Sequence, residues 1–152
     1  STSKNSHHTV AEKEKANIPD IFYKVRCNGV WLPEVKNLED YAGIKGRAIT
    51  DIAIRVSVGK VWYQAHTKSG WLPKVSGYDI DDYENGYAIR VYYTTPQSLA
   101  NSLGKYLVAK YRVSATGNEY FDWQHDDQTT NNQDGYAGLF GNSIDRVLLV
   151  LE

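Results

Sequence analysis

The residues of this chain that could do chemistry are aromatic and acidic side chains that recur along it. Tryptophan opens the phrase Trp-Leu-Pro-Glu-Val at 31–35 and returns in Trp-Leu-Pro-Lys-Val at 71–75, while Trp123 stands in a looser third copy. The flat face of an indole ring suits the apolar face of a sugar ring, as it suits other planar or aliphatic surfaces. A tryptophan in every repeat is also often a core residue. Both interpretations of Trp31, Trp71 and Trp123 are open at the level of the sequence.

The second recurrent element is a carboxylate close to the phrase Tyr-Ala-Gly or its shorter form Tyr-Ala. The groups are Glu39 and Asp40 with Tyr41, Asp82 and Glu84 with Tyr87, and Asp134 with Tyr136. A carboxylate accepts two hydroxyl hydrogen bonds, and an adjacent aromatic ring stacks on a sugar, so the combination indicates saccharide binding. Asp residues and glycines also build turns, and that interpretation is equally favoured.

Signatures of catalysis and of metal binding are missing from the sequence. A glycosidase needs two carboxylates across one cleft, one of them with a raised pKa, whereas the acids here are spread over repeats. His66 and His125 have no His-Glu-x-x-His spacing, and the acidic run at 79–82 lacks the glycine and glutamate of a calcium loop. Cys27 is the only cysteine, and we expect it to be a small buried hydrophobe. We therefore predict no catalytic residue, no metal and no cofactor.

The elements that position these residues belong to three internal repeats, at about 22–59, 60–95 and 106–152. In the first two repeats a tyrosine in a strand-like run precedes the tryptophan by eight residues, at Tyr23 and Tyr63. The middle repeat departs from the pattern, because its Tyr-Ala continues directly into a strand-like run. Repeated units of this kind build one shared core and present similar surface sites.

Short runs rich in Tyr, Val, Ile and Thr, separated by Gly, Asn, Asp and Pro, predict an all-β fold. Strands are expected over residues 22–27, 49–58, 61–66, 89–94, 107–114 and 146–151. One connecting helix is expected over residues 97–103, after Pro96. Three β-rich repeats favour a β-trefoil-like barrel, with a β-sandwich as the alternative.

Size and charge narrow the classes of partner. The 152 residues suit a single domain, predicted over 21–152, and the net charge of −1 offers no basic field for nucleic acid. No apolar stretch approaches the length of about 20 residues that a membrane span requires. Residues 1–20 contain no aromatic side chain and alternate in charge at 12–15, so we expect a flexible linker or arm.

Several phrases of the chain resemble the C-terminal cell-wall-binding region of peptidoglycan hydrolases. The similar proteins are phage endolysins and N-acetylmuramoyl-L-alanine amidases of clostridial-type Gram-positive bacteria and, more remotely, the clostridial Trp-containing repeats. The phrases are Ile-Phe-Tyr-Lys-Val at 21–25, Trp-Leu-Pro-Glu-Val at 31–35, Asn-Leu-Glu-Asp-Tyr-Ala-Gly at 37–43, Asn-Gln-Asp-Gly-Tyr-Ala-Gly at 132–138 and Ile-Asp at 144–145. This resemblance implies noncovalent attachment of a linked upstream hydrolase to the bacterial wall, which the protein reaches by secretion or phage lysis.

The expected function is therefore that of a noncatalytic cell-wall-binding module for a wall polysaccharide or for the glycan of peptidoglycan. Trp31, Trp71 and Trp123 would stack on sugar rings, and Asp40 and Asp134 would accept hydroxyl hydrogen bonds. The tyrosines of the recurrent phrase, Tyr41, Tyr87 and Tyr136, would line the same pockets. Three alternatives stay open: a free-standing lectin or toxin-receptor domain, a self-contained hydrolase, and a module for self-assembly into a homo-oligomer.

Overall fold

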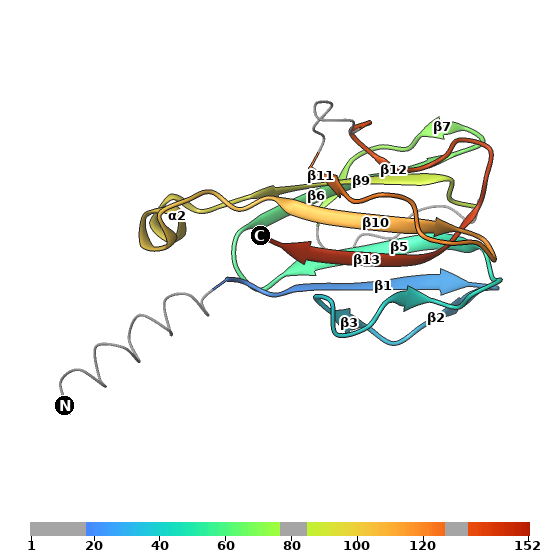
Figure 1. Cartoon of the computed structure of the whole chain (residues 1–152), viewed down its shortest axis with the longest axis horizontal. Coiled ribbons are helices and arrows are strands. Elements are labelled where there is room, and N and C mark those ends of the chain that lie inside the picture. Colours follow the sequence, from blue (N-terminus) through green and yellow to red (C-terminus); the bar gives the residue numbers. More distant parts are fainter. Residues whose placement is uncertain (1–17, 77–84, 127–133) are drawn as a thin grey trace.

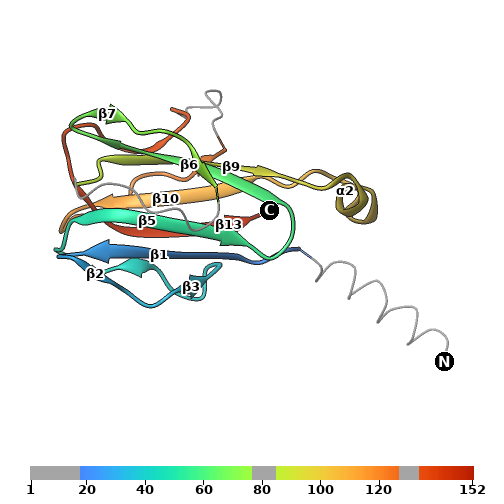
Figure 2. The same cartoon turned by 180° about the vertical axis from the view of Figure 1, so that it is seen from behind.

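The structure of the protein, a computed structural model, describes residues 18–76, 85–126 and 134–152. Most of these residues that have regular structure lie in β-strands, so the predicted all-β fold is confirmed (Figures 1 and 2). The elements are β1 (Ile21–Cys27), β2 (Val30–Trp31), β3 (Val35–Lys36), β4 (Ala42–Gly43), β5 (Ile49–Val56), β6 (Lys60–Thr67), β7 (Gly70–Trp71), β8 (Val75–Ser76), β9 (Ala88–Thr94), α2 (Gln97–Leu103), β10 (Ala109–Ala115), β11 (Gln124–His125), β12 (Ala137–Gly138) and β13 (Ile144–Leu151). The predicted arm falls almost wholly on residues 1–17, outside the described residues.

Three antiparallel pairs of long strands form the centre of the molecule: β1 with β5, β6 with β9, and β10 with β13. Each pair belongs to a separate sheet that two-residue strands complete (Figure 1). The hydrogen bonds of the described strands run within these three sheets and do not close a barrel, so the predicted trefoil-like barrel is not confirmed. Apolar side chains from all three sheets meet in one core.

Two short strands leave their own repeat and join the sheet of a neighbour. β4 pairs with β13, and β12 pairs with β9. Each of these strands ends in a glycine with positive φ, +123° at Gly43 and +116° at Gly138. A β-carbon on Gly43 would lie 1.9 Å from the carbonyl oxygen of Asp145, and one on Gly138 would lie 2.3 Å from that of Tyr87. The glycine of Tyr-Ala-Gly therefore allows a close approach between repeats that no other residue permits.

The recurring core residue is a tyrosine. One buried tyrosine lies at the same place in the first long strand of each pair: Tyr23 in β1, Tyr63 in β6 and Tyr111 in β10. It is the third residue of β1 and β10 and the fourth of β6, which begins one residue earlier. Their hydroxyl groups are paired: the Leu149 N–H donates to Tyr23 at 3.1 Å, and the Ile54 N–H donates to Tyr63 at 3.2 Å. Both bonds join different repeats. Burial raises the pKa of Tyr23 to about 12, because the charged form would lose its hydration.

The predicted helix over 97–103 is confirmed as α2. It ends at Gly104, which has φ +75° and donates its N–H to the Ala100 carbonyl at 2.8 Å. Leu99 and Leu103 pack against the core from this helix. The six predicted long strands are also found, with ends that lie within two residues of those in the structure.

Candidate functional site

The register of the short strands shows which residues of the three repeats occupy the same position. In each repeat one aromatic residue pairs with the long strand three residues after the buried tyrosine. The pairs are Arg26 with Trp31, His66 with Trp71, and Ser114 with Tyr120. Tyr120 is therefore the counterpart of Trp31 and Trp71, which corrects the sequence alignment that placed Trp123 there. The physical reason is a longer turn after β10, which delays the paired aromatic residue.

The three predicted tryptophans are half-buried, and basic side chains lie over their rings. The contacts are Lys24 and Arg26 over Trp31, at 5.1 and 5.3 Å from the ring centroid, Arg90 over Trp71, at 4.5 Å, and Lys110 and Arg112 over Trp123, at 4.9 and 5.0 Å. Such cation–π contacts stabilise a partly exposed indole. The tryptophans thus lie outside the buried core, and a cation already occupies part of each ring surface.

The aromatic side chains that gather on the surface come from two neighbouring repeats. The members of this aromatic cluster are His66, Trp71, Tyr87, Tyr136 and Phe140. Tyr136 stacks on Phe140 at 4.8 Å between centroids and meets Trp71 edge-on at 5.8 Å. Phe140 also stacks on His66 at 3.8 Å and is 44% exposed. Because β12 pairs with β9, the Tyr-Ala-Gly of the third repeat carries Tyr136 to the tryptophan of the second.

His66 lies in the cluster as a neutral ring. Burial lowers the pKa of His66 below its usual value, since the charged form would lose hydration. Its Nδ1 atom is buried and has no hydrogen-bond partner among the described residues. The face of the ring is instead used for stacking on Phe140.

A surface cavity of about 200 Å³ opens beside the cluster, between β11 and β12. Its lining combines two carboxylates, an amide and aromatic or aliphatic side chains. These residues are Asp122, Asp134, Gln124, Phe121, Tyr136 and Leu139. The Asp134 N–H donates to Gln124 Oε1 at 3.0 Å, which joins the two sides of the cavity. Tyr136 belongs both to this Tyr136 cavity and to the aromatic cluster.

Four of the eight predicted site residues are thus brought together: Trp71, Tyr87, Asp134 and Tyr136. Trp31, Trp123, Asp40 and Tyr41 are not part of this surface. Asp40 supports the turn interpretation instead, because its Oδ1 accepts the Tyr41 N–H at 2.8 Å and its carbonyl accepts the Tyr23 hydroxyl. Asp82 and Glu84 lie outside the described residues.

Sequence reasoning missed Phe121, Asp122, Gln124, Leu139 and Phe140. Phe121 and Phe140 are two of only three phenylalanines in the chain, and Phe140 follows Tyr-Ala-Gly by two residues. That proximity was a usable signal. The contribution of Asp122 and Gln124 depends on the register of β11 against β10, which the misaligned third repeat concealed.

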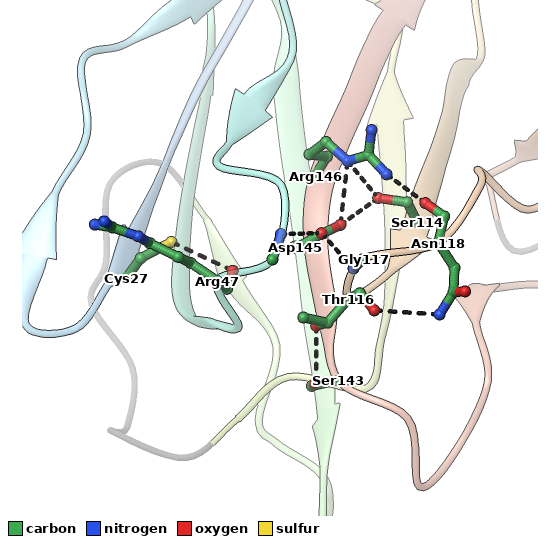
Figure 3. Close-up of polar contacts among 10 residues, drawn as sticks. Cys27, Arg47, Ser114, Thr116, Gly117, Asn118, Ser143, Asp145 and Arg146 are labelled. Atoms are coloured by element: carbon green, nitrogen blue, oxygen red, sulfur yellow. Dashed lines mark hydrogen bonds and ion pairs between the residues drawn. The ribbon is translucent and has the colours of Figure 1, made fainter.

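The most buried carboxylate of the described chain has a structural role. Asp145 accepts hydrogen bonds from the Gly46 and Gly117 N–H groups, both at 2.8 Å, and from the Ser114 hydroxyl and the Arg146 guanidinium (Figure 3). Burial alone would raise the pKa of Asp145, but these hydrogen bonds outweigh burial and lower it. The carboxylate joins the loop after β4 to the turn after β10 and is closed to solvent.

Comparisons of the chain with models of protein families, with curated proteins and with solved structures find no match. In the described ranges, no three His, Cys, Asp or Glu side chains gather in a way that could hold a metal ion. No helix among the described residues is long and apolar enough to cross a membrane. The function of the chain is therefore inferred from its sequence and from the Tyr136 cavity.

Proposed function

We propose that this chain is a noncatalytic module that binds a glycan of the bacterial cell wall and thereby holds a linked peptidoglycan hydrolase on the wall. The observation that carries the proposal is the Tyr136 cavity, whose lining combines two carboxylates, an amide and aromatic rings. The sequence resemblance to the wall-binding regions of endolysins and amidases supports the same function and names the wall as the place where the chain acts.

The chemistry of the cavity suits a sugar. Asp122 and Asp134 supply acceptors for hydroxyl groups, and Gln124 supplies an amide that both donates and accepts. Tyr136 offers an aromatic ring for the apolar face of a pyranose, and Phe140 and Trp71 hold that ring in place. A ring fixed by its neighbours loses little side-chain entropy on binding.

The same two carboxylates support binding more than hydrolysis. A glycosidase needs a general acid whose pKa is raised by an apolar, water-excluded environment. Asp122 and Asp134 are both exposed to solvent, so neither lies in such an environment. Exposed carboxylates of this kind are suited to accepting hydrogen bonds from sugar hydroxyl groups.

The test is co-sedimentation of the purified chain with purified walls from a panel of Gram-positive bacteria, before and after chemical removal of the wall polysaccharides. Loss of binding with the polysaccharide identifies that polymer as the ligand, whereas retained binding identifies peptidoglycan. Asp134→Asn and Asp40→Asn form a matched pair, and only the first is expected to weaken binding. Failure to bind any wall, or release of reducing sugar by the chain alone, would contradict the proposal.

A further inference from the structure

The connection between β9 and β10 is longer than its counterpart between β5 and β6. The corresponding connection between β5 and β6 uses only residues 57–59, yet it joins two sheets of the same kind. Residues 95–108 instead include α2 and an extended return. Leu99 and Leu103 of these additional residues pack against the core, and the return after α2 also places Tyr106 at the surface.

The extended return presents a tyrosine to solvent in a fixed orientation. Tyr106 is 63% exposed, the largest exposed fraction among the exposed large hydrophobic side chains of the described chain. Its hydroxyl donates to Gln97 Oε1 at 2.7 Å, and Gln97 Nε2 donates to Asn101 Oδ1 at 2.9 Å. Helix α2 therefore orients a ring that contributes little to the core.

A cavity of about 320 Å³ lies between this tyrosine and β9. Its lining includes a second aromatic ring, a carboxylate and a hydroxyl group, from Tyr92, Asp126 and Thr94. The ring of Tyr92 is held in place by stacking on Trp62, with 5.3 Å between ring centroids and 11° between ring planes. Trp62 is the one tryptophan outside the recurrent phrases, and this contact gives it a role.

We infer that this Tyr106 cavity is a second saccharide subsite, which takes another sugar ring of the glycan bound at the Tyr136 cavity; the inference rests on the proposed function. The two cavities contain the same combination of aromatic rings and a carboxylate. Gln124 lines the first and Asp126, two residues further on, lines the second. The Tyr106 cavity, at about 320 Å³, reaches the size of small-ligand pockets, about 300 Å³ and above, and the Tyr136 cavity, at about 200 Å³, is smaller.

Two linked subsites raise the affinity for a chain of sugars without any change at either one. Along β9, residue 89 pairs with β12 at the Tyr136 cavity and Tyr92 lines the Tyr106 cavity, three residues or roughly 10 Å apart. A glycan of several units would span that distance, whereas a monosaccharide would not. The Tyr106 cavity therefore favours long glycan fragments over short ones.

The experiment uses the full chain and purified Gram-positive walls that the wild type binds, with binding measured by co-sedimentation. Tyr106→Ala is expected to weaken binding about five- to tenfold, as loss of an aromatic contact does. Tyr106→Phe keeps the ring and should remain within about twofold of the wild type. The control Lys105→Ala, at the neighbouring exposed position, should bind like the wild type.

A second measurement uses solubilised wall fragments separated by length. The wild type should bind long fragments more tightly than short ones, and Tyr106→Ala should lose that difference. If Tyr106→Ala binds walls like the wild type while Tyr136→Ala is weakened, the second subsite is wrong and the proposed function stands. If the wild type binds no wall, both are overturned.

Discussion

Tyr41 and Tyr136 show how the surroundings of a residue decide its role. Both precede Ala-Gly, and both glycines bring a short strand against a neighbouring sheet. Tyr136 reaches Trp71 and Phe140, whereas the residue in the position of Phe140 in the first repeat is Lys45. The third repeat therefore builds an aromatic surface with Tyr-Ala-Gly, whereas the first repeat uses the same phrase to bring β4 against β13 beside Asp145.

Asp145→Asn is expected to destabilise the fold by about 3 kcal/mol, because a buried carboxylate with several donors is replaced by a group that cannot accept them all. Because the pKa of Asp145 is lowered in the folded state, its charged form stabilises the fold fully at pH values above about 3.9, the pKa of an unfolded Asp. This contribution is lost as the pH falls through the lower pKa of the folded state. Urea unfolding at pH 7 and below pH 4 measures both effects. The exposed control Asp40→Asn should change stability little at pH 7; equal losses in the two variants would contradict the structural role.

His66 should make the stability of the fold depend on pH. Its pKa is lowered in the folded state, so the contribution of the neutral ring is complete above the unfolded value of about 6.5 and is lost as pH falls through the folded value. Thermal unfolding between pH 7 and pH 5 should show this decline in the wild type and in His125→Gln. His66→Phe keeps a stacking ring that cannot take up a proton, so the decline in stability should be absent in this variant. An unchanged decline there would contradict the assignment.

At the scale of elements, two-residue strands connect the repeats. β4 and β12 are too short to be stable alone, and their geometry depends on a glycine pressed against a neighbouring backbone. Alternating patterns in the sequence predicted the long strands, because one face of each is buried, and Pro96 predicted the start of α2. They could not predict β4 and β12, whose pairing partners lie in other repeats. The turn after Ser114 hid Tyr120 for a related reason, since its length is visible only through pairing with β10.

Gly43→Ala tests the close approach of β4 to β13. A β-carbon would lie 1.9 Å from a backbone oxygen at a φ of +123°, so we expect a loss of about 3 kcal/mol or more in the free energy of unfolding. Gly141→Ala is the matched control, because φ is +92° there but no atom lies within 4 Å of the added carbon. It should cost about 1 kcal/mol. Chemical denaturation compares the two, and similar losses would show that the contact is not tight.

At the scale of the whole molecule, three similar sheets surround one core but present different surfaces. The repetition in the sequence predicted shared positions, and the buried tyrosines occupy them in all three sheets. It could not predict that half of the expected site residues would gather at one junction. That asymmetry comes from Phe140, which joins the cluster in the third repeat and whose position in the first repeat is Lys45.

The measurement that tests the central claim most directly is the affinity of Tyr136→Ala and Tyr41→Ala for a wall that the wild-type chain binds. Both variants remove a tyrosine from the same phrase, and thermal unfolding establishes that each is folded. We predict that Tyr136→Ala binds about tenfold more weakly, as loss of an aromatic contact implies, and that Tyr41→Ala stays near the wild type. Equal binding by the two folded variants would contradict the assignment of the Tyr136 cavity as the glycan-binding site.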